Sequence, residues 1–319
     1  MNDCVQAGYK ITVAALPHIA AVYRAMHGIE QVLEWSFVRK RIELIKRIRT
    51  ARLIRDQFDI CIICPNSFKS ALIPWLAKVI ARVGYLGEYR AWLLTKVFAN
   101  PDRHHRGSMV DFYRKLGPSE VAQRDVPQLF VSEELINREL TQFSLLRGEF
   151  TVIAPGAEYG VAKRWPVEYY AELAGKISLE GGTVVILGAV SDHEVAEKIK
   201  NSALPISKRT EKTTGLIKNL AGHTKLSQAI ALIAGAKCLI SNDSGLMHIG
   251  AALSIPQVAI FGSSSPLHTP PLNERANVLW LSLSCAPCFK RDCPLGHLRC
   301  LRGISVDQVG SAVENCLTL

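Results

Sequence analysis

The amino-acid sequence predicts an α/β protein built from two Rossmann-like domains, each with a parallel sheet covered by helices. Short apolar segments alternate with helical segments along most of the chain, which is typical of parallel sheets with helices on both faces. The length of 319 residues suits two domains. A hydrophobic content of 48% with 21% charged residues is typical of a globular fold. We expect the domains to span residues 1–148 and 149–319, with the boundary at Gly148.

The first half contains two strand-like segments, each followed by a helical one. The segment 58–64 is expected to be the more buried strand, because its apolar residues run together without alternating. In chain order, the expected elements of this half are 10–16 (strand), 18–26 (helix), 58–64 (strand), 68–80 (helix), 109–116 (helix) and 132–146 (helix).

A strongly basic segment, 38–55, lies between these two strands. Ile42, Ile45 and Ile48 recur in it at helical spacing, and arginines and lysines fill most other positions. Leu53 is a further candidate for the apolar stripe. One interpretation is a solvated helix that packs this stripe on the sheet. The other is a helix whose basic face rests on an anionic membrane surface. The two interpretations are compatible.

The second half repeats the alternation more regularly. Its apolar segments are short and continuous, as expected for strands that are buried on both faces of a sheet. The expected strands are 150–154, 183–187, 237–240 and 257–261, and the expected helices are 167–179, 192–200 and 225–234.

The stretch from Ser241 to His248 connects one of these strands to a helix. Asp243 or Ser244 suits the helix N-cap, because a short side-chain oxygen accepts from free backbone amides. Gly245 has no Cβ, so a ligand can lie close to the backbone there. A helix that begins at the carboxyl end of a parallel strand directs N–H groups and partial positive charge into the crevice, which suits a phosphate. An ordinary strand–helix turn is the alternative.

Two further polar loops follow strands at the same expected sheet edge. The loop 155–166 contains two glycines and the basic pair Lys163 and Arg164, and a lysine there can neutralise a departing phosphate. The loop 262–271 contains three serines and a threonine, whose hydroxyls can bind sugar or phosphate oxygens. Considered separately, the basic pair can simply be exposed on a loop, and the hydroxyls can form the hydrogen bonds of a turn. Three such loops on one rim favour a ligand site.

The charge balance narrows the possible partners. The sequence has 38 Lys and Arg against 28 Asp and Glu, which favours anionic partners such as phosphorylated substrates or acidic lipid headgroups. We find no basic patch with interleaved aromatic residues, so no nucleic-acid partner is expected. No apolar run reaches the ~18 residues that span a bilayer. The N-terminus lacks a signal-peptide pattern, and the nine cysteines are expected as reduced thiols, so we expect a cytoplasmic protein.

Several long segments resemble the bacterial ADP-heptose:lipopolysaccharide heptosyltransferases of glycosyltransferase family 9. In the second half these are PGAEYGVAKRWP, NLAGHTKLSQAIALIAGAKCLISNDSGLMHIGAAL and FGSSSPLHTPPL. In the first half they are CPNSFKSALIP and RVGYLGEYRAWLL. The similarity covers the chain from about Lys10 onward. It implies two Rossmann-like domains that face each other across a cleft, the GT-B arrangement.

The resemblance implies an inverting transfer of L-glycero-D-manno-heptose from ADP-heptose to the first heptose of the lipopolysaccharide inner core. The second half would hold the nucleotide sugar. Lys163 would contact the diphosphate, and Ser244 and Gly245 at the helix start would receive it. Asp243 would bind the donor through a hydroxyl, which makes Lys163 and Asp243 the catalytic candidates. Further donor-binding candidates are Gly156, Ala157, Glu158 and His248, although packing within the helix is the alternative for the histidine.

The first half would then hold the acceptor, heptosyl-Kdo-lipid A. Asn66, Ser67 and Lys69, at the carboxyl end of a strand, are the candidates for binding it. The Kdo carboxylates and lipid A phosphates match the basic charge balance. No metal and no cofactor are expected if Lys163 and the helix terminus carry the leaving charge. The expected location is cytoplasmic, peripheral on the inner face of the inner membrane.

One departure from the family pattern lies at the start of the chain. Family members open with a strand, a Gly-Asp turn and a helix, and the aspartate of that turn is thought to act as the base on the acceptor hydroxyl. No Gly-Asp pair precedes Lys10, so the resemblance implies an incomplete N-terminal domain, and no general base is assigned. Loss of a general base costs about 10²–10⁴-fold in rate. The alternatives are transfer to Kdo, or a nucleotide-sugar-binding remnant with little or no turnover.

Four cysteines cluster near the C-terminus. A C-x₂-C pair with two more cysteines nearby can form a tetrahedral zinc site. The second pair has six intervening residues, which is not the spacing of a standard zinc knuckle. Reduced thiols in a loop are the favoured interpretation and a structural metal is the alternative. The four residues are Cys285, Cys288, Cys293 and Cys300.

Overall fold

The computed structural model describes residues 4–5, 7–38, 41–102, 107–117, 126–207 and 215–318. The chain forms two compact units. The smaller comprises Met1–Ala20 and Gly28–Arg124, and the larger comprises Ala21–His27 and Asp125–Leu319. The division therefore falls at residues 124 and 125 and not at the expected 148 and 149. The reason is helix α6 (Glu133–Gln142), whose Ile136 and Leu140 belong to the hydrophobic core of the larger unit.

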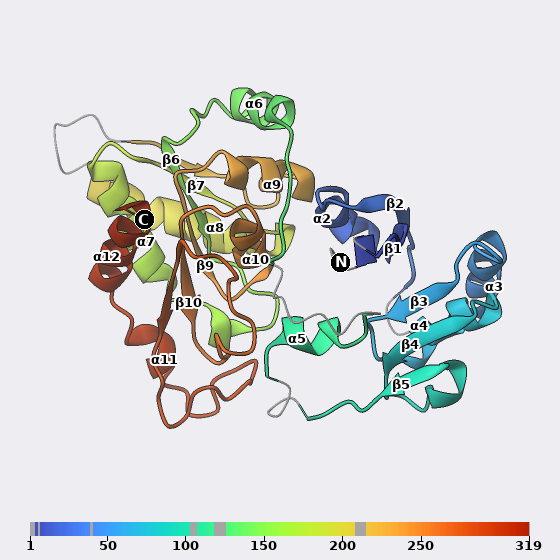
Figure 1. Ribbon diagram of the computed structural model, residues 1–319. Coiled ribbons are helices and arrows are strands. Elements are labelled where there is room, and N and C mark those ends of the chain that lie inside the picture. Colours follow the sequence, from blue (N-terminus) through green and yellow to red (C-terminus); the bar gives the residue numbers. More distant parts are fainter. Residues whose placement is uncertain are drawn as a thin grey trace. The chain divides into compact units, whose positions relative to one another are not determined.

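The larger unit is organised around a six-stranded sheet in which every neighbouring pair is parallel (Figure 1). The strand order is β11-β10-β9-β6-β7-β8. The parallel sheet is confirmed, and the four strands expected in this half are confirmed as β6, β7, β9 and β10. The strands are β6 (Phe150–Ala154), β7 (Thr183–Ile186), β8 (Ile217–Asn219), β9 (Cys238–Asn242), β10 (Gln257–Phe261) and β11 (Ala276–Trp280).

The strand order reverses between β6 and β9. From β6 the chain adds β7 and β8 on one side, and then returns to add β9, β10 and β11 on the other. In open α/β sheets, the crevice outside the carboxyl ends of the strands at such a reversal is the usual ligand site. The loop 155–166 and the turn at Asp243 leave the sheet at this point.

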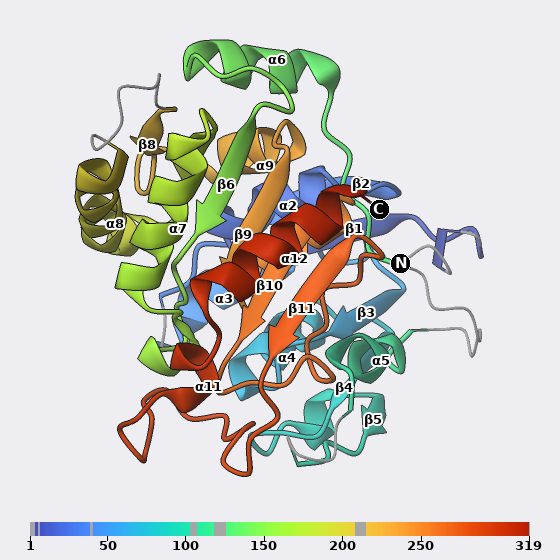
Figure 2. The ribbon, with the colours of Figure 1, turned by 90° about the vertical axis from the view of Figure 1, so that its left-hand side faces the viewer.

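Helices cover both faces of this sheet. One face carries α7, α8 and α12, and the other carries α9 and α10. Figure 2 shows α12 lying across β9, β10 and β11, in agreement with its contacts. Alternate residues of β6 serve the two layers: Ile153 packs on the first face, and Val152 and Ala154 on the second. The helices are α7 (Val167–Leu179), α8 (His193–Ser207), α9 (Leu226–Ala234), α10 (Gly245–Ala252), α11 (Arg299–Arg302) and α12 (Val306–Thr318).

The smaller unit contains two separate parallel sheets, one of two strands and one of three. The strands expected at 10–16 and 58–64 are confirmed as β1 and β3. The strands are β1 (Ile11–Ala15), β2 (Ile29–Glu34), β3 (Ile60–Ile63), β4 (Ala81–Tyr85) and β5 (Lys96–Phe98). The helices in this part of the sequence are α2 (Ala20–Arg24), whose residues after Ala20 belong to the larger unit, α3 (Leu44–Leu53), α4 (Phe68–Leu76) and α5 (Met109–Arg114).

The orientation of α3 is opposite to the expected one. Ile45 and Leu53 are 70% and 74% exposed, whereas Arg47 is buried. The guanidinium of Arg47 explains this orientation: its Nη1 donates to the carbonyl of Lys69 (2.8 Å), and the group lies 4.1 Å from the ring centroid of Phe37. Carbonyl acceptors and an aromatic face compensate the burial of an arginine. The prediction that the apolar stripe packs on the sheet was therefore wrong.

Strand β3 is also less covered than expected. Ile60 and Ile62 are 39% and 38% exposed, whereas Ile63 is buried. The buried apolar residues of this unit form several small clusters and not one continuous core. One face of β3 is consequently left partly open, although its continuous apolar sequence predicted burial on both faces.

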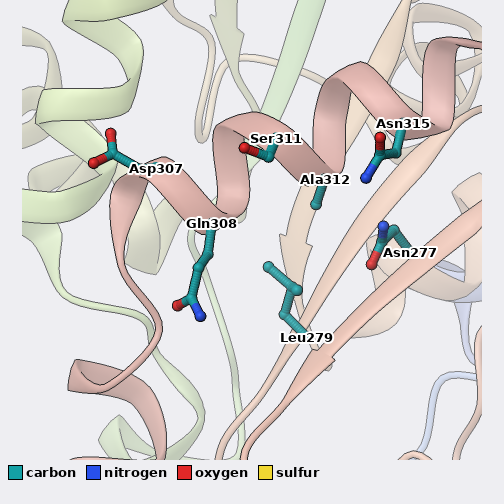
Figure 3. A pocket seen from close by; sticks show the side chains of 7 residues that line it. All are labelled: Asn277, Leu279, Asp307, Gln308, Ser311, Ala312 and Asn315. Atoms are coloured by element: carbon teal, nitrogen blue, oxygen red, sulfur yellow. The ribbon is translucent and has the colours of Figure 1, made fainter.

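An open pocket of about 360 Å³ lies between α12 and the edge strand β11 (Figure 3). Asn315 of α12 and Asn277 of β11 lie opposite each other there. None of the expected site residues lines this pocket. Its lining residues are Asn277, Leu279, Asp307, Gln308, Ser311, Ala312 and Asn315.

Across the described residues, no helix combines the length and the apolar character that crossing a bilayer requires.

Candidate functional site

The three loops that follow β6, β9 and β10 meet at Asp243. Its carboxylate accepts a hydrogen bond from the Nζ of Lys163, which comes from the loop after β6. It also accepts from the hydroxyls of Ser264 (2.6 Å) and Thr269 (3.3 Å), which come from the loop after β10. The expected convergence of these loops on one rim is therefore observed.

The ion pair between Lys163 and Asp243 is nearly enclosed. The side chains are 13% and 4% exposed, respectively. Three donors hold the carboxylate in place, and it in turn fixes the position of the ammonium group. An ammonium group has three N–H donors, and in the described part of the chain Asp243 is the one hydrogen-bond acceptor that the Nζ contacts. Lys163 therefore keeps donors for an anionic ligand.

Helix α10 begins directly after this ion pair. Ser244 is its N-cap residue, but the hydroxyl makes no capping bond, and among the described residues its buried Oγ has no partner. The space beside Gly245 is open, because a Cβ placed there would meet no atom within 4 Å. The first amides of a helix and its dipole attract anions. The unpartnered hydroxyl of Ser244, the open space beside Gly245 and the start of α10 therefore come directly after the residue that binds Lys163, a combination that fits a phosphate.

His248 lies one turn further along α10. Desolvation lowers the pKa of its imidazole, the carboxylate of Asp243 opposes this shift, and the ammonium of Lys163 adds to it. An imidazole with a lowered pKa is neutral at neutral pH. His248 can therefore offer one donor or acceptor to a ligand without adding charge.

A buried asparagine fixes the loop after β6 to the end of β9. The side chain of Asn242 is fully buried, and its amide group donates to the carbonyl of Pro155 (2.7 Å). Its oxygen accepts from the backbone N–H of Trp165 (3.0 Å) and from the hydroxyl of Tyr170 (3.1 Å). Both ends of the loop that carries Lys163 are thereby held. Asn242 could not be predicted as a site residue, because an amide at the end of an apolar strand is equally compatible with solvent exposure.

The remaining donor-site candidates differ in what they can contact. Gly156 lies so close to the carboxylate of Asp192 that a Cβ at this position would overlap it. Ala157 is buried, and its carbonyl accepts from the guanidinium of Arg164 (3.3 and 3.2 Å). Arg164 also lies 3.7 Å from Asp192, so this arginine holds the loop together. Glu158 is exposed.

In the smaller unit, the acceptor candidates lie at the start of α4. Ser67 is the N-cap residue of this helix, and Lys69 is its second residue. A fully buried arginine, Arg90, holds the segment in place. It donates to the carbonyls of Tyr85 (2.9 and 3.1 Å) and Ser67 (3.4 Å) and to the side-chain oxygen of Asn66 (3.4 Å). Sequence reasoning missed Arg90, since an arginine in a loop is ordinarily expected to be exposed.

The clustered cysteines line one small cavity of about 20 Å³. Their thiols are free, and within the described ranges no three His, Cys, Asp or Glu side chains are arranged to hold a metal ion. The cysteine-bearing loop supports the neighbouring site, because the carbonyl of Arg291 accepts from the backbone N–H of Ala162 (2.9 Å), the residue before Lys163. The lining thiols are those of Cys285, Cys288, Cys293 and Cys300.

Comparison with known proteins identifies the family. The family model described as Glycosyltransferase family 9 (heptosyltransferase) matches residues 47–299. The chain belongs to glycosyltransferase family 9. It is therefore a glycosyltransferase, and the family resemblance in its sequence is confirmed. This family 9 chain is 37% identical over 279 residues to lipopolysaccharide heptosyltransferase 2 of Escherichia coli (strain K12), with 84% of this chain and 78% of that protein covered.

Other family 9 members show the same relationship. Lipopolysaccharide heptosyltransferase 2 of Salmonella typhimurium (strain LT2) is 36% identical over 288 residues, which cover 87% of this chain and 81% of that protein. The solved structure of E. coli ADP-heptose lps heptosyltransferase II superposes with a TM-score of 0.82 at 34% identity, and the match covers 99% of this chain and 92% of that one. The expected GT-B fold class is thereby confirmed.

Proposed function

We propose that this family 9 glycosyltransferase transfers L-glycero-D-manno-heptose from ADP-heptose to the first heptose of the lipopolysaccharide inner core, with inversion. The observation that carries the proposal is the ion pair of Lys163 and Asp243 beside the start of α10, where the strand order reverses. The names of the relatives support the choice of sugar and acceptor, because lipopolysaccharide heptosyltransferase 2 of two species is 36–37% identical to this chain.

In this proposal the donor diphosphate binds at the start of α10. The hydroxyl of Ser244 and the backbone amide of Gly245 donate to it, and the ammonium of Lys163 contacts the same group. The acceptor hydroxyl attacks the heptose C1 from the face opposite the diphosphate, the bond between C1 and the phosphate oxygen breaks, and the proton of the hydroxyl passes to water. Negative charge then grows on the leaving ADP, where Lys163 and the helix terminus stabilise it without a metal ion. The donor site is completed by Asp243, Gly156, Ala157, Glu158 and His248.

The acceptor, heptosyl-Kdo-lipid A, binds at the start of α4 in the smaller unit. Asn66, Ser67 and Lys69 are the residues we assign to it. Support comes from the positive charge of Lys69 and of Arg90, which lies directly behind this segment. The carboxylates of Kdo and the phosphates of lipid A are attracted to a chain that carries an excess of basic residues. Because lipid A lies in a membrane, the protein works as a peripheral cytoplasmic protein on the inner face of the inner membrane.

The decisive test compares two purified acceptors, Kdo-lipid A with and without the first heptose. With ADP-heptose, we expect the mass of one added heptose on the heptosylated acceptor alone, at a rate unchanged by EDTA. Preferred transfer to the acceptor without heptose would overturn the proposed specificity. Calorimetric binding of ADP-heptose without transfer to either acceptor would identify a binding protein. A rate that EDTA abolishes and a divalent ion restores would overturn the metal-free scheme.

A further inference from the structure

Helix α3 of the smaller unit (Figure 1) has an amphipathic sequence and presents a surface that the proposed sites do not use. Residues that lie four, seven and eight positions apart on a helix share one face, and Ile45, Arg49, Arg52 and Leu53 have this spacing. All four are exposed. We call this face, two large aliphatic side chains with two arginines between them, the α3 surface.

The positive charges of the α3 surface have no acidic partner among the residues that the structure describes. In the described part of the chain, no carboxylate forms an ion pair with Arg49 or Arg52. The segment 38–55 contains a single acidic residue, Glu43, and its carboxylate lies 4.0 Å from the Nζ of Lys46. Exposed aliphatic side chains among unpaired basic residues are typical of helices that lie in the headgroup region of an anionic bilayer. The α3 surface carries positive charge alone, which complements an anionic bilayer. Lipid phosphates have no fixed arrangement, so the arginines need no particular geometry to bind them.

The inner side of α3 connects this surface to the start of α4. The guanidinium of Arg47 donates to the carbonyls of Ile42 (2.6 Å) and Lys69 (2.8 Å) and lies over the ring of Phe37. Because Arg47 is buried, these bonds are shielded from water and hold α3 firmly on α4. Lys69 is one of the residues that we assign to the acceptor, so the α3 surface is joined to the acceptor segment by one side chain.

We propose that the α3 surface docks the protein on an anionic bilayer and thereby presents the start of α4 to a lipid-borne acceptor. This inference rests on the proposed function for the nature of the acceptor. Ile45 and Leu53 enter the boundary between headgroups and acyl chains, and Arg49 and Arg52 bind lipid phosphates. Each basic residue at an anionic surface strengthens partitioning by about five-fold, so two arginines together supply about 25-fold.

Vesicle sedimentation of the full chain tests this docking. The protein is mixed with phosphatidylethanolamine vesicles that contain phosphatidylglycerol, and separately with phosphatidylcholine vesicles. We expect salt-sensitive binding to the anionic vesicles alone. The double variants Ile45→Ser/Leu53→Ser and Arg49→Gln/Arg52→Gln should each lower partitioning by about ten-fold or more. Equal sedimentation of the wild type and both double variants would overturn the proposal, and so would equal binding to both kinds of vesicle.

Matched controls replace an exposed aliphatic and an exposed basic residue of the larger unit. Leu146→Ser and Lys198→Gln change the same kinds of side chain outside the smaller unit. They should sediment like the wild type, and a loss equal to that of the α3 variants would overturn the proposal. Size-exclusion chromatography adds another readout. If the α3 variants dissociate an oligomer that the wild type forms, the surface belongs to a second copy of the chain and the lipid assignment fails.

Transfer to two forms of the acceptor separates this inference from the proposed function. The α3 variants should keep the wild-type rate on a water-soluble acceptor without acyl chains and lose rate on the same acceptor embedded in vesicles. Equal loss on both acceptors would overturn the docking role. If the wild type transfers to neither acceptor but still binds anionic vesicles through the α3 surface, the docking stands and the proposed function fails.

Discussion

Replacing Lys163 with alanine removes the cation of a nearly enclosed ion pair. Within the described ranges, the donors that remain to the carboxylate of Asp243 are the hydroxyls of Ser264 and Thr269. Removing one partner of a buried ion pair costs about 3–5 kcal/mol. We expect about 3 kcal/mol here, at the lower end, because two hydroxyls still bind the carboxylate. In the proposed function the same change also removes the group that stabilises the leaving phosphate, and loss of one such group lowers kcat by about 10²–10³-fold.

The double variant Lys163→Ala/Asp243→Asn separates the two effects. Because asparagine is neutral, no charge is left unpaired, so the free energy of unfolding in urea should recover while kcat stays about 10²-fold below the wild type. Arg291→Ala is the matched control: this guanidinium lies 5.3 Å from the ring centroid of Tyr159, as the Nζ of Lys163 does. It should leave kcat for heptose transfer unchanged. Recovery of kcat in the double variant, or an unchanged kcat in Lys163→Ala, would refute the role of Lys163 on the diphosphate.

Three further predictions concern stability, pH and thiol chemistry. Asn242→Ala removes three buried hydrogen bonds worth about 1 kcal/mol each, so the free energy of unfolding in urea should fall by about 3 kcal/mol. An unchanged free energy of unfolding would contradict the role of Asn242 in holding the loop after β6. The pKa of the His248 imidazole is lowered in the folded protein. The contribution of this group to the free energy of unfolding is therefore complete above the pKa of the unfolded chain, near 6.5, and declines as the pH falls below that value. On acidification, the melting temperature of His248→Gln should therefore fall less than that of the wild type. An equal fall in the two proteins would contradict this prediction. Backbone N–H groups, that of Leu298 foremost, lower the pKa of the Cys293 thiol, whereas burial raises that of Cys238 to about 12. Iodoacetamide at neutral pH should modify Cys293 far earlier in a mass-mapped time course, and equal rates would count against the thiolate argument.

The strands of the larger unit could be predicted closely because most of them are buried on both faces. The bounds of β6 and β10 are those expected, because each of these largely apolar strands ends at a glycine-bearing loop. The strands β8 and β11 were missed for different reasons. β8 has only three residues, too few to show a period. β11 lies at the sheet edge and is only partly buried, and Asn277 interrupts its apolar residues.

The buried face of α3 could not be predicted, because periodicity tells which residues share a face of a helix and not which face is covered. The buried face is determined by the hydrogen bond from Arg47 to the carbonyl of Lys69, which lies 22 residues further along the sequence. The candidate site shows the same limit. The sequence indicated that three loops share one rim, but the pairing of Lys163 with Asp243 is a contact across 80 residues that only the folded sheet creates.

The hydrogen bonds around Asp243 also determine how much of the chain must be synthesised before the proposed nucleotide site can form. Lys163 lies 80 residues before Asp243, and Thr269 lies 26 residues after it. Closing loops of such length requires the strands between them to be aligned first. A nascent chain that ends before Ser264 has neither hydroxyl that fixes the carboxylate. Ligand added during synthesis would therefore stabilise only chains that extend past Thr269, which makes nucleotide protection a reporter of the step in which the loop after β10 joins Asp243.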